Sequence, residues 1–280
     1  MSEAGGRASP VELAFTAYGD ADRRRETVVV LHGLFGSGRN WMTVARRLGE
    51  RHRVLAPDLR NHGSSPWAEP MAYPAMAADV AALLVHQANR PVTLVGHSMG
   101  GKAAMALALV RPGLVRRLVV VDVAPVAYES SFASYARAMH EANLDGVTRR
   151  AQVDEQLVDA VPDPAVRAFL LQNLVLEPGG ARWRVNLPVI EAAMSTISGF
   201  PEVPPGLQFG KPVLFVAGER SDYLSPAQEP VVRRLFPQAD VAVVPGAGHW
   251  VHAEKPAEFL AVLERVLPEA SSPQHPAPGQ

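Results

Sequence analysis

The chain has 280 residues, of which 48% are hydrophobic, and its formal net charge at pH 7 is -1. This length suits one large domain, with or without an insertion, and the balanced charge without a long basic or acidic run disfavours nucleic acid as a partner. The absence of cysteine excludes disulfides, thiolate metal sites and cysteine nucleophiles.

Neither a targeting segment nor a membrane span is visible. The first twenty residues lack a basic start followed by an apolar stretch, and no run approaches the roughly 20 apolar residues that cross a bilayer. We therefore expect a cytoplasmic protein without a membrane partner. Residues 1–10 are polar and Gly-rich and residues 271–280 are Pro-rich, so we expect flexible tails there. Nothing indicates an oligomeric state.

Short apolar runs alternate with helix-like segments along most of the chain. Residues 11–15 alternate at period two, as a half-exposed edge strand would, and the later runs are continuously apolar, as buried parallel strands are. These later runs are residues 27–31, 53–56, 92–95, 118–121, 213–216 and 241–244. Helix-like segments occupy residues 75–88, 101–110, 226–235 and 256–267. The alternation predicts an α/β fold with a mostly parallel sheet and helices on both faces.

The alternation stops after residue 121 and resumes at residue 213. Residues 127–200 contain only helix-like sequence with scattered aromatic and methionine residues, and a Pro-rich connection follows. We therefore predict a core of residues 11–126 and 206–268, and a helical cap of residues 127–205 over the active site. A helical layer without a functional role is the alternative.

The segment from Gly96 to Gly100 has the pattern G-x-S-x-G, directly after an apolar strand and directly before a helix. Such a turn forces its central residue into a strained backbone conformation, and the glycines leave space for the close approach of strand and helix. Ser98 would then be raised above the sheet with its hydroxyl exposed. We predict that Ser98 is a nucleophile; a simple Gly-rich turn is the alternative.

A second Gly-rich loop follows the strand at residues 27–31. A tetrahedral intermediate needs two fixed N–H donors, and we assign these to the backbone of Met99, which follows the nucleophile, and of Leu34 in this loop. The loop glycines could instead serve only to turn the chain. A phosphate site is disfavoured because neither G-x-G-x-x-G spacing nor a P-loop lysine is present.

His249 follows the last predicted strand, and its imidazole can take the serine proton at neutral pH and return it to a leaving group. Nucleophile first and histidine last is the α/β-hydrolase order. His252 is the main competitor among nine histidines. We expect His32 and His62 to be structural, and we expect the side chain of His97, which flanks the nucleophile on the same turn, to point elsewhere. We expect the remaining four on the surface, namely His52, His86, His140 and His275.

The imidazole needs a carboxylate partner, and two candidates follow core strands. Asp122 ends the strand after the nucleophile helix, and Asp222 follows the next core strand. Spacing alone does not decide between them. Asp58 also ends a strand, but on the side of the Gly-rich loop, so we interpret it as structural.

Six segments together resemble one subfamily of the α/β-hydrolases, the YbfF-type esterases and their mitochondrial abhydrolase-domain relatives. They are residues 32–37, 60–63, 96–102, 121–126, 183–187 and 246–253. The resemblance implies an α/β-hydrolase fold, hydrolysis of short-acyl esters or thioesters, and no cofactor or metal. It also implies that the acid follows the strand after the nucleophile helix, which favours Asp122, although this chain departs from the subfamily by carrying Asp222 as well.

The leading hypothesis is therefore a serine carboxylesterase that acts on a small-molecule ester through an acyl-enzyme. An acyl-CoA thioesterase or a polyester-type depolymerase would use the same residues, and basic cap residues such as Arg137, Arg149 and Arg150 could then face a phosphate. A solvated helix face is the simpler interpretation of these arginines. A non-catalytic small-molecule receptor is the third hypothesis. The natural substrate does not follow from the sequence.

Overall fold

A computed structural model describes residues 9–21, 26–129 and 132–267. Its centre is a seven-stranded sheet in the order β1-β3-β2-β4-β5-β8-β9, in which only β1 runs antiparallel to its neighbour. The strands are β1 (Phe15–Tyr18), β2 (Thr27–Leu31), β3 (Arg53–Pro57), β4 (Val92–His97), β5 (Val115–Val121), β8 (Val213–Gly218) and β9 (Ala239–Val244). The predicted mostly parallel sheet is confirmed.

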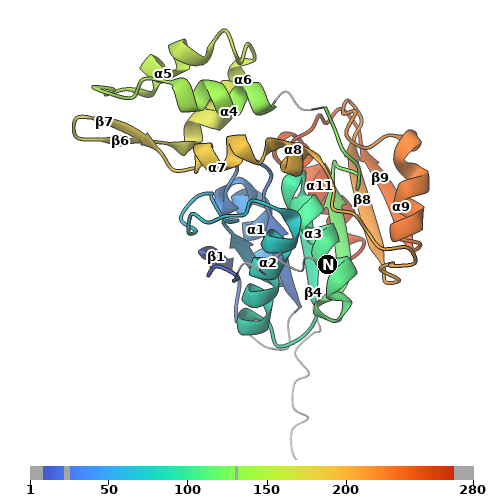
Figure 1. Ribbon diagram of the computed structural model, residues 1–280. Coiled ribbons are helices and arrows are strands. Elements are labelled where there is room, and N and C mark those ends of the chain that lie inside the picture. Colours follow the sequence, from blue (N-terminus) through green and yellow to red (C-terminus); the bar gives the residue numbers. More distant parts are fainter. Residues whose placement is uncertain (1–8, 22–25, 130–131, 268–280) are drawn as a thin grey trace, which may run out of the picture.

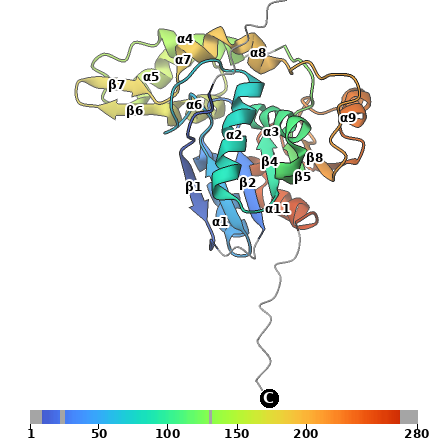
Figure 2. The same ribbon diagram turned by 60° about the horizontal axis from the view of Figure 1, so that its bottom comes forward.

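Side chains that alternate along each strand divide the core into two layers, as the period of two requires. In β2, Val29 and Leu31 pack on one face and Val28 and Val30 on the other, and all four are fully buried. The first face carries α2 (Tyr73–Gln87), α3 (Met99–Val110) and α9 (Glu229–Leu235). The second carries α1 (Met42–Gly49), α10 (Val251–Glu254) and α11 (Pro256–Glu264). Figure 2 shows this sandwich, and helices on both faces are confirmed.

The edge strand differs from the prediction, because it covers Phe15–Tyr18 and not residues 11–15. The backbone N–H of Val11 donates to Oδ1 of Asp79 at 2.8 Å, and that of Ala14 donates to Oγ of Ser65 at 2.9 Å. The period-two pattern therefore marks a buried side chain at Leu13, but side chains accept the N–H groups of Val11 and Ala14, while the Ala14 carbonyl accepts the Asp58 N–H just past the end of β3.

The segment between β5 and β8 forms a separate layer, which lies at the top of Figures 1 and 2. Its helices are α4 (Phe132–Glu141), α5 (Arg150–Leu157), α6 (Pro164–Leu170), α7 (Leu187–Ala192) and α8 (Met194–Ser198). This layer meets the loops that follow the core strands, because Nδ2 of Asn173 donates to the Phe35 carbonyl and the N–H of Asn186 donates to the Asn61 carbonyl. The predicted cap boundaries at residues 127 and 205 stay a prediction.

The expectation that this layer is purely helical is wrong. A two-stranded hairpin, β6 (Leu174–Glu177) and β7 (Gly180–Trp183), projects from it. Only Pro178 and Gly179 connect the strands, and Gly179 has φ +89°. A two-residue loop with a positive φ suits a hairpin, so the Pro-Gly-Gly run was the missed signal.

The short 3₁₀ helices are η1 (Gly38–Trp41), η2 (Pro112–Leu114), η3 (Leu171–Asn173) and η4 (Pro226–Gln228). Among the described residues, no helix is both long and apolar enough to span a bilayer. Apart from residues 9 and 10, the two predicted tails lie outside the described residues.

Candidate active site

Ser98 stands on a sharp turn between β4 and α3. Its backbone has φ 50° and ψ -118°, a conformation that L-residues rarely adopt. The flanking glycines make this turn possible, since a Cβ on Gly96 would lie 2.3 Å from the Gly100 carbonyl oxygen and one on Gly100 would lie 2.4 Å from the His32 carbonyl oxygen. The N–H of Ser98 donates to the Val121 carbonyl at 3.0 Å, which ties the turn to β5.

Asp122 and His249 meet beyond the ends of β5 and β9. Asp122 is fully buried, and its Oδ2 accepts a 2.7 Å hydrogen bond from Nδ1 of His249. The Ser221 hydroxyl donates to the same oxygen, and the Gly218 N–H donates to Oδ1 at 3.0 Å. Three donors thus fix the carboxylate, and Nε2 is the ring nitrogen of His249 that stays free to accept a proton.

The loop that carries His249 is fixed from both sides. The Tyr223 ring stacks on the imidazole at a centroid distance of 4.2 Å, and the Trp250 ring meets it edge-on at 5.5 Å. The Glu254 carboxylate accepts the N–H groups of Gly248 at 2.8 Å and of Trp250 at 3.2 Å, the two residues that flank His249. The imidazole therefore has little freedom to leave Asp122.

Asp222, the alternative acid, is exposed in the loop after β8. Within the part of the chain that the structure describes, it makes no hydrogen bond and no ion pair. β8 ends at Gly218, and the N–H of that residue binds Asp122. The structure therefore brings Asp122, and not Asp222, to His249.

The expectation that the His97 side chain points elsewhere is wrong, because its ring lies 4.7 Å from that of His249 and lines the same hollow as Ser98. His252 and His97 lie beside His249 but are placed for other tasks. His252 is buried and stacks on Trp41 at 4.1 Å, and burial lowers its pKa to about 3. Burial, with the neighbouring charge of His249, also holds the pKa of His97 well below its usual value, and its Nε2–H donates to the His249 carbonyl at 2.9 Å. His52, expected on the surface, is only 5% exposed, and its N–H donates to the carbonyl at the end of α1.

The predicted oxyanion donors come from two sides of Ser98. Met99 is the first residue of α3, where a backbone N–H has no acceptor within its own helix. Leu34 precedes Phe35, which has φ 59°, and among the described residues the Leu34 N–H has no acceptor. Both N–H groups thus stay available, and both residues line a hollow at Ser98.

Two buried histidines hold the Leu34 loop. Nε2 of His62 accepts the Phe35 N–H at 3.1 Å, while its Nδ1–H donates to the Arg60 carbonyl at 3.0 Å. His32 makes the same kind of bridge, accepting the Leu59 N–H at 2.8 Å through Nε2. Burial lowers the pKa of both, that of His62 to about 3, and this favours the neutral ring that can accept through Nε2.

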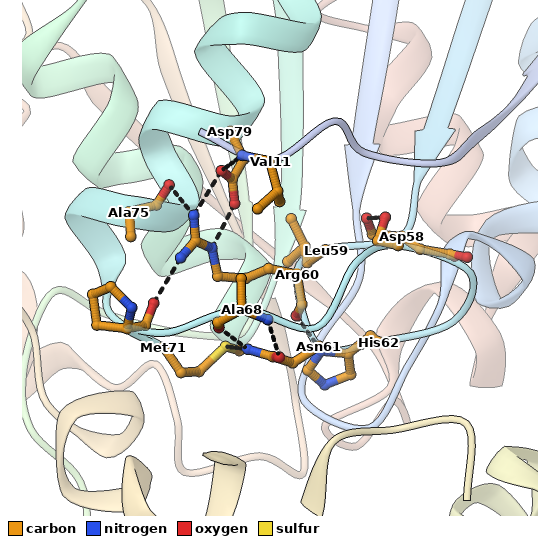
Figure 3. A network of polar contacts seen from close by, with 12 residues as sticks. Val11, Asp58, Leu59, Arg60, Asn61, His62, Ala68, Met71, Ala75 and Asp79 are labelled. Carbon is orange, nitrogen blue, oxygen red and sulfur yellow. Dashed lines mark hydrogen bonds and ion pairs between the residues drawn. The ribbon is translucent and has the colours of Figure 1, made fainter. Parts of the chain in front are cut away.

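A buried ion pair, drawn in Figure 3, lies next to the histidines that hold the Leu34 loop. Nε and Nη2 of Arg60 bind the two carboxylate oxygens of Asp79 at 2.6 and 2.7 Å, and both side chains are fully buried. The next residue, Asn61, has φ 65°, and its side-chain oxygen accepts Nδ2 of Asn186 from α7's start at 3.0 Å. Arg60 thus fixes the segment that joins the core to the overlying layer.

Two hollows open at Ser98, and Leu34 lines both. The first leaves about 20 Å³ for water-sized groups and is lined by Asn40, His249 and Trp250. The second leaves about 40 Å³ and is mostly apolar, with Met194 of α8 among its walls. The arrangement offers one space at Ser98 that His249 itself lines, and a second that Met99 and residues of α8 line together with Ser98.

Lys102 is a site residue that sequence reasoning missed. Its Nζ donates to the carbonyls of Val126, Ser198 and Gly199 at 2.8, 2.7 and 2.6 Å, and burial lowers its pKa to about 7. Val126 lies where the chain enters the layer between β5 and β8, and Ser198 and Gly199 lie where the chain leaves that layer. A lysine in the otherwise apolar α3 was the available signal, whereas no sequence signal pointed to Ser221.

No group of three or more metal-ligating side chains is found within residues 9–21, 26–129 and 132–267. The expectation that the chain needs neither metal nor cofactor stays a prediction.

Comparison with known sequences gives close relatives over nearly the whole chain. The sequence model of a family described as "alpha/beta hydrolase fold" matches residues 26–256. The sn-1-specific diacylglycerol lipase ABHD11 of Xenopus laevis is 44% identical over 261 residues, which is 90% of this chain and 83% of that protein. Esterase YbfF of Escherichia coli (strain K12) is 38% identical over 245 residues, covering 86% and 92%.

Comparison with solved structures agrees. A marine microorganism esterase superposes with a TM-score of 0.87 at 34% identity, covering 92% of this chain and 100% of that chain. The thioesterase domain from the curacin biosynthetic pathway has a TM-score of 0.67 at 24% identity, so it shows the fold alone.

Proposed function

The chain belongs to the α/β-hydrolase family and is a hydrolase that acts on esters, and from this premise we propose that Ser98, His249 and Asp122 carry the reaction through an acyl-enzyme. The observation that carries the proposal is the 2.7 Å hydrogen bond from His249 to the buried Asp122, with Ser98 lining the same hollow as the imidazole. A buried carboxylate bonded to Nδ1 of a histidine is the contact that holds the imidazole for proton transfer from a serine, which supports the proposal.

In the first half of the proposed reaction, Nε2 of His249 takes the hydroxyl proton as Oγ of Ser98 attacks the ester carbonyl. The negative charge that develops on the carbonyl oxygen is held by the N–H groups of Leu34 and Met99. The intermediate collapses, the bond to the alcohol breaks, and the protonated His249 gives its proton to the leaving alkoxide.

In the second half, water takes the place of the alcohol. His249 accepts a proton from the water as its oxygen attacks the acyl-enzyme, and then returns it to Oγ of Ser98 as the carboxylic acid leaves. Asp122 keeps the Nδ1 proton throughout and stabilises the imidazolium that forms in each half.

We place the acyl group in the apolar hollow and the alcohol in the hollow beside His249, because the leaving oxygen must meet the imidazole. About 40 Å³ is left in the apolar hollow, and one water needs roughly 10–15 Å³ of such space, so the hollow suits an acyl chain of only a few atoms. Short-acyl esters are therefore the proposed substrates.

A lipid ester is the second candidate, because several relatives are named as diacylglycerol lipases. A long acyl chain would require α8 to move, since Met194 and Ile197 of that helix close the apolar hollow. Acyl-CoA thioesters are a third class that the same residues could cleave. A profile of kcat/KM from acetyl to dodecanoyl nitrophenyl esters separates short-acyl esters from lipid esters. The small volume of the apolar hollow predicts a maximum at acyl chains of about two to four carbons.

The residue assignment is tested with Ser98→Ala and 4-nitrophenyl butyrate. Without the hydroxyl no acyl-enzyme can form, so turnover should fall by at least about a thousandfold. Ser195→Ala is the matched control, because that serine is exposed on α8. A fluorophosphonate should label the wild type at Ser98. Undiminished turnover in Ser98→Ala would contradict the proposal.

A further inference from the structure

A third hollow lies close to the catalytic one but on the other side of the Leu34 loop. It has a volume of about 290 Å³, and its walls come from the core loop at residues 35–40, from Gly63 in the loop after β3, and from the overlying layer. Three arginines line it, namely Arg39 of η1, Arg150 of α5 and Arg184, which follows β7. No aspartate or glutamate is among the described residues that line it.

Two of these guanidinium groups have no partner within the described residues. Arg39 is exposed and Arg184 is half-buried, and neither makes an ion pair or a side-chain hydrogen bond there. Arg150 donates to the Leu171 and Leu174 carbonyls at 3.4 and 2.9 Å, which leaves several of its five N–H donors unused. Three like charges around one hollow repel each other, and a bound anion would remove that repulsion.

The rest of the lining adds the amide of Gln172 as a donor. Nδ2 of Asn40 donates to Oε1 of Gln172 at 3.3 Å, so the amide nitrogen of Gln172 stays available. Asp58 lies behind Gly63 at the rim, but its two oxygens already accept the N–H groups of Gly38 and Ser64 at 2.7 and 2.8 Å. The hollow therefore presents guanidinium groups and the Gln172 amide as donors, as a site for a phosphate or carboxylate does.

Asn40 connects this hollow to the reaction centre, because it also lines the hollow that contains Ser98 and His249. Residues 34 and 36 line the catalytic hollow while residues 35 and 37 line the arginine hollow, so the same short loop separates the two. An anion held by the arginines would thus lie on the His249 side of the nucleophile, where the leaving group is placed.

We propose that the hollow formed by Arg39, Arg150 and Arg184 is a binding site for an anionic group, a phosphate or a carboxylate, on the leaving-group part of the substrate. The position of this site on the leaving-group side depends on the proposed function. Of the three cap arginines singled out in the sequence, only Arg150 lines the hollow: Arg137 pairs with Glu191 at 3.5 Å, and Arg149 is exposed outside it.

The experiment compares substrates that share a scissile bond and differ in one charge. Phosphate is probed with S-butyryl-4′-phosphopantetheine against S-butyryl-pantetheine, and with 1-butyryl-glycerol 3-phosphate against 1-butyryl-glycerol. Carboxylate is probed with 3-butyryloxypropanoate against its primary amide. The readout is the ratio of kcat/KM within each pair. We expect a ratio of at least about ten for one charged group, the factor that a single charge-assisted hydrogen bond provides, and a decrease at high salt.

Variants locate the effect. Arg39→Gln and Arg184→Gln should each lower the ratio about tenfold, and Arg39→Gln is the more secure because its exposed side chain is unimportant for folding. Arg149→Gln is the matched control and should leave the ratio unchanged. Ratios near one in the wild type for all pairs, or ratios that neither hollow variant lowers, would overturn the anion site. Failure of the wild type to cleave even the uncharged members would instead refute the proposed function.

Discussion

The two walls beside Ser98 use histidine in opposite ways. On the wall formed by residues 122, 218–223 and 249, His249 binds a buried carboxylate and keeps one nitrogen free. On the wall formed by residues 32–35 and 59–62, His32 and His62 use both nitrogens to bridge backbone groups. Burial and partners, and not residue type, therefore decide whether an imidazole uses both nitrogens to hold a loop or leaves one of them free.

The largest effect is predicted for a substitution of Asp122, in the wall that contains His249. Asp122→Asn should lower kcat by about 10⁴-fold, because an amide at this position favours the wrong histidine tautomer and cannot stabilise the imidazolium. The measurement is kcat with 4-nitrophenyl butyrate. Asp222→Asn is the matched control, and the exposed position of Asp222 predicts nearly wild-type kcat. The reverse pattern would show that Asp222 is the acid.

An intermediate effect is predicted for the ion pair of Arg60 and Asp79, which supports the wall that contains His32 and His62. Asp79→Asn leaves the charge of the fully buried Arg60 without a carboxylate, which should cost about 3–5 kcal/mol in the free energy of unfolding. Urea denaturation measures this loss. The exposed pair of Arg47 and Glu50 offers a control, because Arg47→Gln should not change stability measurably. If Asp79→Asn lowered the free energy of unfolding by much less than this, the ion pair would not be what stabilises residues 59–62.

The smallest effect sharpens the contrast between the histidines. Because burial lowers the pKa of His62 to about 3, the folded chain leaves it neutral between that pH and the ordinary value near 6.5, whereas the unfolded chain protonates it. The unfolded state binds more protons in this range, so stability falls as pH falls below 6.5, by about 1.4 kcal/mol per pH unit for this group.

His62→Gln removes that titration but keeps an oxygen that can accept the Phe35 N–H. The decrease in unfolding free energy between pH 7 and pH 5 should therefore be smaller than in the wild type by about 2 kcal/mol. Urea denaturation at the two pH values checks it. His86→Gln, at an exposed position on α2, should reproduce the wild-type decrease. An unchanged pH dependence in His62→Gln would argue against a neutral His62.

The alternation of apolar runs and helix-like segments was enough to predict the sheet, and its failures have local causes. Residues 11–14 have the spacing of a strand but bind side chains, and the hairpin at residues 174–183 was hidden in a helix-like region because its strands are only four residues long. Lys102 was missed because its three acceptors lie 24, 96 and 97 residues away along the chain.

By itself the sequence determined the turn at Ser98, since the glycines and the apolar strand that produce the turn are neighbours in the chain. It also placed two carboxylates after neighbouring strands, but it could not choose between them. Only the tertiary structure decided that Asp122 meets His249, 127 residues away, while Asp222 points to solvent. The physical reason is that a turn depends on the backbone within a few residues, whereas a contact between distant side chains depends on strand order and on the path of each loop.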